Sequence, residues 1–223
     1  MRNHTRRCTI CVFLMLILCG TGPAPPAAAG EPAAVPLPPP QTNGGKPLMQ
    51  ALALRATSRA FAPDPIPAQT LSNLLWAAWG INRPGNGKRT APSARNRQEI
   101  ELLVVRADGT FLYDAAANRL LPVAAGDHRA LTGVQSFAKD APLTLLLVAD
   151  ASRIPGGGKD PEALQMAWAD AGYISQNIYL FCASEELATG ARASIDRPAL
   201  ARALGLKESR IILLAQGVGR PAR

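Results

Sequence analysis

Cysteine is scarce in this chain of 223 residues: there are four, and three of them lie within the first 20 residues. Only Cys182 lies further along, so a chain that has lost this N-terminal segment cannot form an internal disulfide. Cys8 and Cys11 make a single C-x-x-C pair without a second pair to complete a zinc site, and we interpret them as part of an apolar segment. We therefore predict neither a disulfide framework nor a metal site.

Other absences narrow the function classes. The apolar stretch at residues 8–20 has about a dozen residues, whereas a membrane-spanning helix needs roughly 20. No run of Lys and Arg with interleaved aromatic residues occurs, which argues against a nucleic-acid-binding surface. The glycines at 156–158 are not followed by Lys and Ser or Thr, so we interpret them as a flexible loop rather than a P-loop. Histidine occurs twice, and we interpret His128 as a surface residue rather than a catalytic base.

The N-terminus has the pattern of an export signal. Residues 1–7 carry three arginines, residues 8–20 are apolar and residues 27–29 are alanines, which is the order that a signal peptidase reads. We predict that residues 1–29 are a signal peptide and that the protein is exported to the periplasm of a bacterium, with no stable membrane span after cleavage. An uncleaved anchor, a lipoprotein at Cys19 and twin-arginine export are alternatives. Because this segment carries three arginines and no acidic residue, its removal lowers the net charge from +8 to +5.

The rest of the chain predicts a short linker and one domain. Residues 30–46 are rich in Pro and Gly and are expected to be a disordered or extended linker, so the folded domain spans 47–223. Hydrophobic periodicity and turn signals predict an α+β fold with a mixed central sheet flanked by helices. The expected elements are helices over 47–57, 67–79, 127–134, 160–183 and 196–204, a polar loop over 82–97, a hairpin from 100–105 to 111–113, and strands over 143–149 and 210–215.

Three polar clusters interrupt this framework. In the first, RATSRAF at 55–61, two arginines four residues apart flank two hydroxyls near a helix end, which suits a phosphate clamp. The second is a polar loop around Ser93, Arg95 and Asn96 that leads directly into a strand. The third is VGRPAR at 218–223, where a glycine permits close backbone approach and two arginines add charge. Taken alone, the three clusters are more simply interpreted as a charged helix end, an ordinary loop–strand junction and a basic tail, in that order.

In this order the clusters resemble the nitroreductase superfamily. RATSRAF resembles that family's opening Arg-x-Ser-x-Arg/Lys motif, with Thr57 in the serine place. TLSNLLWAAWGINRPGNGKRTAPSARNRQ, DAGYISQNIYLFCASEELATG and AQGVGRPAR resemble its next segment, its long central dimer helix and its closing segment. Arg220 stands where that closing segment has an aromatic residue. The likeness covers 47–223 and is closest to the branch that includes the SagB-type dehydrogenases.

The resemblance implies a cofactor and a site. FMN is expected at the interface of a homodimer to which both chains contribute, and the long helix is expected at that interface. By this resemblance, Arg55, Thr57 and Arg59 are expected to hold the phosphate and ribityl chain of FMN. Arg220 and Arg223 are also expected to approach the phosphate. Ser93, Ala94, Arg95 and Asn96 are expected at the isoalloxazine edge, and Ala193 and Ser194 near the reactive N5. We hypothesise that Arg95 stabilises the reduced, anionic flavin.

The resemblance also implies a reaction class. A donor would pass electrons to the flavin and leave before a small organic acceptor takes them, a ping-pong scheme that needs no obligate acid or base from the protein. The chain has no Lys-Tyr dipeptide, the pair that azoline-oxidising members of the SagB branch use. An exported enzyme would lack cytosolic NAD(P)H, the usual reductant, so the electron donor is open. Two alternatives stay open: a degenerate relative that binds flavin without turnover, and a basic module that binds nucleic acid or an anionic surface.

Overall fold

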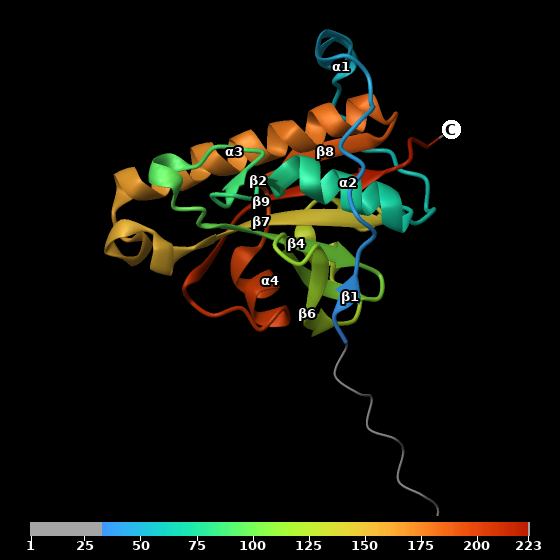
Figure 1. Cartoon of the computed structure of the whole chain (residues 1–223). Helices are drawn as coiled ribbons and strands as arrows, with labels where there is room; N and C mark the ends of the chain where they lie inside the picture. Colours follow the sequence, from blue (N-terminus) through green and yellow to red (C-terminus); the bar gives the residue numbers. More distant parts are fainter. Residues whose placement is uncertain (1–32, 223) are drawn as a thin grey trace, which may run out of the picture. The chain divides into compact units, whose positions relative to one another are not determined.

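The computed structural model describes residues 33–222, so the predicted signal peptide at 1–29 and Arg223 lie outside the described part of the chain. The described residues fold as an antiparallel sheet with helices on both faces (Figure 1). None of the helices in this part combines the length and the hydrophobicity that a membrane span requires.

Seven strands form the main sheet in the order β1-β6-β5-β4-β7-β9-β8. All six neighbouring pairs are antiparallel, so the α+β class is confirmed but the strands do not form the mixed sheet that we expected. The interior strand β7, between β4 and β9, is buried at every position, as its continuous apolar run predicts. The bounds are β1 Val35–Pro36, β4 Ile100–Arg106, β5 Gly109–Asp114, β6 Arg119–Ala125, β7 Leu143–Asp150, β8 Ala188–Arg192 and β9 Arg210–Gly219.

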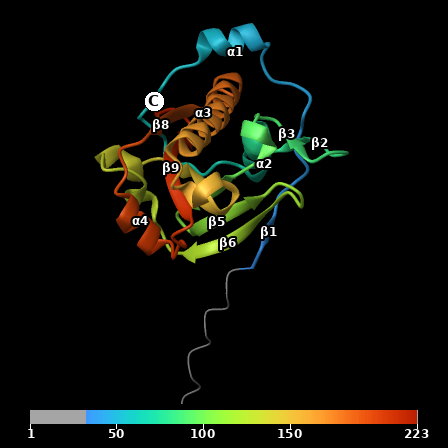
Figure 2. The same ribbon diagram turned by 90° about the vertical axis from the view of Figure 1, so that its left-hand side faces the viewer.

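The two faces of the sheet carry two apolar cores. Alternate residues of a strand point to opposite faces, so Leu102 and Val104 of β4 join one core while Leu103 and Val105 join the other. Helices α2 (Ala68–Trp79) and α3 (Pro161–Ser184) cover the first face, and α4 (Arg197–Ala203) covers the second (Figure 2).

The long helix α3 follows directly from its sequence. Asp160 caps its N-terminus by accepting a hydrogen bond from the amide of Glu162 at 3.0 Å, and Pro161 occupies the first turn. Its inward face is built from small and branched residues that are fully buried, including Ala171, Ile174 and Cys182. Burial raises the pKa of the Cys182 thiol to about 12, which fits our interpretation of this residue as a small apolar group.

A shorter helix, α1 (Leu48–Leu54), lies on the outer side of α3 in both views (Figures 1 and 2). Only Ala51 of this helix is buried. Four large apolar side chains on it are exposed by 43–76%, namely Leu48, Met49, Leu52 and Leu54. The described chain therefore carries an unusual amount of uncovered apolar surface on one short helix.

The segment expected to be a linker is extended but belongs to the folded unit. Its strand β1 pairs with β6 at the edge of the sheet. The carbonyl of Pro38 accepts hydrogen bonds from the Ser72 hydroxyl at 2.5 Å and from the Asn118 amide at 2.8 Å. Residues 33–46 are held because polar side chains of α2 and of the β5–β6 turn bind a proline-rich backbone that has few N–H groups of its own.

The polar loop expected at 82–97 contains a small hairpin, β2 (Ile81–Arg83) with β3 (Lys88–Arg89). Arg89 fixes this hairpin to the core, since its guanidinium donates to the carbonyl of Trp79 at 2.7 Å and stacks 4.8 Å from the ring centroid of the same residue. The short helix expected at 127–134 is a single 3-10 turn, Arg129–Thr132, and a second 3-10 turn follows at Ser136–Lys139.

Candidate functional site

The first and third polar clusters meet at the edge of the sheet. After α1 ends, residues 55–61 run extended beside β8, and the amide of Ser58 donates to the carbonyl of Thr189 at 2.8 Å. Phe61 forms a bridge with Pro221, and the amide of Ala62 donates to the carbonyl of Arg220 at 2.9 Å. We call residues 55–61 the clamp segment. The proximity expected between the clamp segment and Arg220 is therefore present in the structure.

The clamp segment presents positive charge without matching negative charge. Arg55, Thr57 and Arg59 are exposed and occupy alternate positions of the clamp segment. The guanidinium of Arg55 lies 5.5 Å from the ring centroid of Tyr179, and that of Arg59 lies 5.9 Å from that of Phe137. Among the described residues, no carboxylate forms a salt bridge with either arginine or with Arg220. Unpaired guanidinium groups beside a hydroxyl are suited to binding a phosphate.

Tyr179 of α3 is a site residue that sequence reasoning missed. Its hydroxyl lies 3.1 Å from the Thr57 hydroxyl and accepts a hydrogen bond from the amide of Ala191 at 2.9 Å. It thereby joins the long helix, the clamp segment and β8 at one point. Its signal in the sequence is weak, because a tyrosine on a long amphipathic helix is equally expected to pack in a core.

Strand β8 approaches the clamp segment so closely that it needs a glycine. A Cβ atom built on Gly190 would lie 2.7 Å from the backbone oxygen of Ser58. Behind this contact, a buried chain of hydrogen bonds runs from the Ser175 hydroxyl to Gln216 at 2.7 Å and from Gln216 to the Thr189 hydroxyl at 3.1 Å. Strand β8 is therefore held by the clamp segment on one side and by this chain of hydrogen bonds on the other.

A further arginine lies buried beneath this region. Arg192 donates to the carbonyl of Thr132 at 2.9 Å and to the hydroxyls of Thr132 and Thr144. Burial lowers the pKa of its guanidinium to about 10, so the group stays charged at neutral pH. It forms no salt bridge with a described carboxylate, and a Cβ on Gly217 would lie 3.4 Å from its Nη1 and 3.2 Å from Phe61. This buried charge adds to the positive potential of the clamp segment.

The second cluster forms a tight turn at the other end of α3. The Ser93 hydroxyl accepts from the amide of Gln98 at 3.0 Å, and the amide of Ala94 donates to Asp170 at 2.8 Å. Arg95 and Asn96 are exposed and have φ values of 53° and 54°, a left-handed conformation that is uncommon for residues other than glycine.

This second cluster does not join the clamp segment within one chain. Its anchor, Asp170, precedes Tyr179 by nine residues on α3, which corresponds to roughly 13 Å along a helix. The Ser93–Asn96 turn and the clamp segment therefore lie against different parts of the same helix.

Ala193 and Ser194 lie beyond the end of β8, away from the clamp segment. The carbonyl of Ala193 accepts from Arg197 at 3.1 Å, and that of Ser194 accepts from the amide of Val134 at 3.0 Å. The β8 residues that contact the clamp segment are instead Thr189 and Gly190. The sequence predicted that residues beyond the long helix belong to the site, but it did not predict strand β8. It therefore could not show which end of β8 contacts the clamp segment.

Comparison with known proteins defines the class. Residues 52–220 match the Nitroreductase family. The chain is 26% identical over 180 residues to "Putative nitroreductase MJ1384" of Methanocaldococcus jannaschii, covering 76% of this chain and 90% of the relative. It is also similar to a crystal structure of a putative nitroreductase from Ralstonia eutropha JMP134, with 37% identity, a TM-score of 0.82, and coverage of 89% of this chain and 94% of that one.

A second solved structure shares the fold and contains a cofactor. It is a crystal structure of a putative nitroreductase in complex with FMN from Desulfovibrio desulfuricans, 23% identical, with a TM-score of 0.56 and coverage of 81% of this chain and 89% of that one. The α+β fold with its long helix and the match over most of the domain define an oxidoreductase of the nitroreductase type. The chain belongs to the nitroreductase family.

Proposed function

We propose that this protein is an FMN-dependent oxidoreductase that works as a homodimer and transfers electrons from a donor to a small organic acceptor. The observation that carries the proposal is the clamp segment, where Arg55 and Arg59 flank Thr57 without a carboxylate partner among the described residues. This donor set fits the phosphate of FMN, because guanidinium groups bind phosphate oxygens bidentately.

In this proposal the protein holds and orients the cofactor. Arg55, Thr57, Arg59 and Arg220 bind the phosphate end, with Tyr179 fixing the Thr57 hydroxyl from the helix side. The Ser93–Asn96 turn offers backbone groups and the Arg95 guanidinium to the edge of the ring system, where a positive charge favours the reduced form. When bound, FMN supplies the redox chemistry, accepting electrons from one substrate and passing them to another in a separate step.

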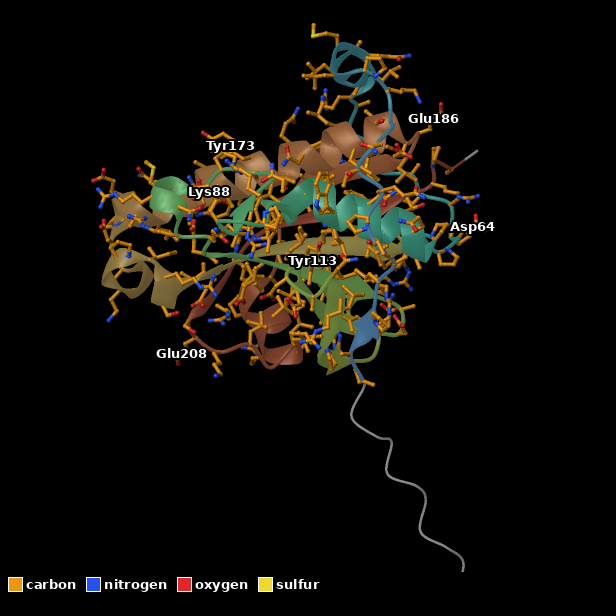
Figure 3. All side chains as sticks on the ribbon, in the orientation of Figure 1. Asp64, Lys88, Tyr113, Tyr173, Glu186 and Glu208 are labelled. Carbon is orange, nitrogen blue, oxygen red and sulfur yellow. The ribbon has the colours of Figure 1, made fainter. Side chains whose placement is uncertain are left out.

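The proposed homodimer is supported by the separation of the two clusters and by exposed apolar side chains. The clamp segment and the Ser93–Asn96 turn of one chain lie against parts of α3 that are roughly 13 Å apart along the helix, so the two clusters of one chain need not serve the same flavin. A second copy related by a two-fold axis across α3 would place its turn near the clamp segment of the first. The outward side of α3 carries exposed Met166 and Tyr173, the latter labelled in Figure 3, and α1 adds the apolar residues named above. Burial of these residues supports an interface between two copies.

The first test is the absorbance spectrum of the purified protein. We expect flavin bands and about one FMN released per chain on heating, in line with one site per chain. Arg55→Ala with Arg59→Ala should weaken FMN binding by about 100-fold, since hydrogen bonds to charged groups contribute about 1.5–3 kcal/mol each. Arg202→Ala, which removes an exposed arginine of α4, should leave binding unchanged. A colourless protein that does not take up added FMN would exclude the proposal and favour the basic-module alternative.

The donor and the location are part of the same proposal. We propose that the protein is exported to the periplasm, so that its reductant is not cytosolic NAD(P)H, and that it belongs to the branch of the SagB-type dehydrogenases. Cell fractionation tests the first point, and anaerobic bleaching of the flavin by candidate donors tests the reductant. A protein that binds FMN but is bleached by no donor would be a flavin-binding relative without turnover.

A further inference from the structure

The positive charge of this chain is concentrated beside the Ser93–Asn96 turn. Residues 81–98 contain five basic residues and no acidic one, which equals the net charge of +5 of residues 30–223, so the remainder of these residues is balanced. Arg89 is engaged with the core, as described above. The other four basic residues are Arg83, Lys88, Arg95 and Arg97. Among the described residues, no carboxylate forms a salt bridge with any of these four. Such a surface attracts anions.

The small hairpin places two of these cations opposite each other. Arg83 of β2 pairs with Lys88 of β3, which is labelled in Figure 3, and both residues are exposed. Directly opposite residues of an antiparallel pair have Cβ atoms about 4.5–5.5 Å apart, and like charges in these positions destabilise the pair. Arg83 is nevertheless held there, because its guanidinium donates to the carbonyl of Arg89 at 2.8 Å and to the side chain of Asn82 at 3.0 Å. An anion bound between the two cations would relieve their repulsion.

The hairpin is joined to the Ser93–Asn96 turn by the side chain of Gln98. Its amide group donates to the carbonyl of Gly87 and to the side chain of Asn96, both at 3.1 Å, and its oxygen accepts from Arg89 at 2.8 Å. The φ values in the turn are positive, 53° at Arg95 and 54° at Asn96, and such a conformation persists only where surrounding contacts hold it. The cations of the hairpin and those of the turn therefore belong to one connected surface.

The carboxyl groups close to this surface do not neutralise it. Glu99 follows Gln98 directly, and Asp170 accepts the amide hydrogen of Ala94 at 2.8 Å. The two acidic residues are only 1% and 3% exposed, however, whereas Lys88 and Arg95 are exposed. Solvent therefore meets the cations of the hairpin and the turn, and not the carboxyl groups behind them.

We propose that the β2–β3 hairpin and the Ser93–Asn96 turn form a binding site for a small organic anion, and that the redox partner of the flavin carries a carboxylate or sulfonate group. The role of this anion as redox partner rests on the proposed function, because that function puts the turn at the edge of the flavin. The binding of an anion does not rest on it. Arg83 and Lys88 bind the charged group, which leaves the rest of the molecule to reach the flavin.

Equilibrium binding of 2-naphthalenesulfonate tests the anion site without a redox reaction. At an ionic strength of about 0.01 M, where screening is weak, Arg83→Gln with Lys88→Gln should weaken binding about fivefold, since two exposed ion pairs are lost. Arg202→Gln with Lys207→Gln is the matched control, because it removes the same charge from exposed positions on and after α4. The control should bind like the unmodified protein. An equal or larger loss in the control, or no binding by the unmodified protein, would overturn the proposal.

A matched pair of quinones tests the redox partner. After the bound FMN has been reduced with one equivalent of dithionite, 1,4-naphthoquinone-2-sulfonate and uncharged 1,4-naphthoquinone each take two electrons and one proton from the reduced flavin and a second proton from water. Arg83→Gln with Lys88→Gln should slow the sulfonate about fivefold at low ionic strength and leave the uncharged quinone unaffected. The variant keeps Arg95, so its affinity for FMN should not change.

The outcomes separate the two parts of the proposal. If the variant slows both quinones alike, or neither, the anion is not the redox partner. If the protein binds the sulfonate at the hairpin but binds no FMN, the proposed function fails and the anion site stands. If the protein binds FMN but the loss of Arg83 and Lys88 does not weaken sulfonate binding, the proposed function stands and the anion site fails.

Discussion

Glu99 makes the stability of the fold depend on pH in the direction opposite to that of Asp114, Asp127 and Asp150. Its pKa rises from 4.5 in the unfolded chain to about 7 in the folded one, so the folded state binds more protons between these values. The contribution of protonated Glu99 to the free energy of unfolding is fully present below about pH 4.5, and it is lost as the pH rises through 7. At pH 8, Glu99→Gln should therefore unfold with a free energy about 1–3 kcal/mol higher than the unmodified protein.

Urea unfolding at pH 5 and pH 8 measures this effect. The two proteins should be nearly equal at pH 5, where most of Glu99 is protonated in the folded state. Asp114, Asp127 and Asp150 have lowered pKa values, so their contributions are present at higher pH and lost in acid. They are unchanged in the variant and do not affect the comparison. A variant that is less stable than the unmodified protein at pH 8 would show that the Glu99 carboxylate is needed in its charged form.

At the residue scale, the sequence predicts the exposed residues of the candidate site better than the residues that hold them in position. Arg55, Thr57, Arg59 and Arg220 can be found because their residue types and spacing suit a phosphate. Tyr179, which contacts Thr57, and Asp170, which anchors Ala94 in the other cluster, lie on a helix whose apolar stripe explains the folding and hides the polar positions within it. Their partners come from distant segments, and only the folded chain shows them.

At the element scale, Gly190 tests whether the contact between β8 and the clamp segment matters. Alanine there would bring its Cβ to 2.7 Å from the backbone oxygen of Ser58, so one of the two segments must move. We expect Gly190→Ala to lower the free energy of unfolding by about 1–3 kcal/mol, as overpacking does, and to weaken FMN binding. Thermal unfolding and FMN titration check both effects.

The matched control is Gly85→Ala in the β2–β3 turn, where an added Cβ meets no atom within 4 Å. It should change neither FMN binding nor the unfolding temperature appreciably. If Gly190→Ala behaved in the same way as this control, the clamp segment would have to be mobile enough to shift away from β8 without loss.

Elements with a strong local pattern could be predicted, and those that depend on neighbours could not. The long helix, the hairpin and the buried strand β7 were predicted to within a few residues. Strand β8 was missed because its sequence, ATGAR, has no large apolar residue and no alternation of apolar and polar residues to mark it as a strand. Strand β6 was not predicted, because it contains Pro122 and half-exposed positions that weaken the strand pattern. Residues 33–46 look like a linker because the side chains that hold them belong to α2 and to the turn before β6.

At the scale of the whole molecule, the two polar clusters of one chain lie apart along α3. The clamp segment lies near the C-terminal part of α3, and the Ser93–Asn96 turn lies near its N-terminal part. Sequence reasoning could name both clusters but not their separation, because the distance between them depends on which faces of α3 they contact. The second copy that we propose would account for both this separation and the exposed apolar residues of α1.

This explanation predicts that dimer formation and cofactor binding fail together. Met49 and Leu52 are 76% and 43% exposed on α1, so Met49→Glu with Leu52→Glu should leave the folded chain intact. In the dimer the two charges would be buried against apolar surface, which should weaken association on the order of 100-fold or more. Light scattering should report the mass of one chain instead of two, and FMN should be lost. Val134→Glu, at an apolar residue that is 69% exposed between the two 3-10 turns, should remain dimeric and yellow. A monomeric double variant that still held FMN would mean that one chain encloses the flavin by itself.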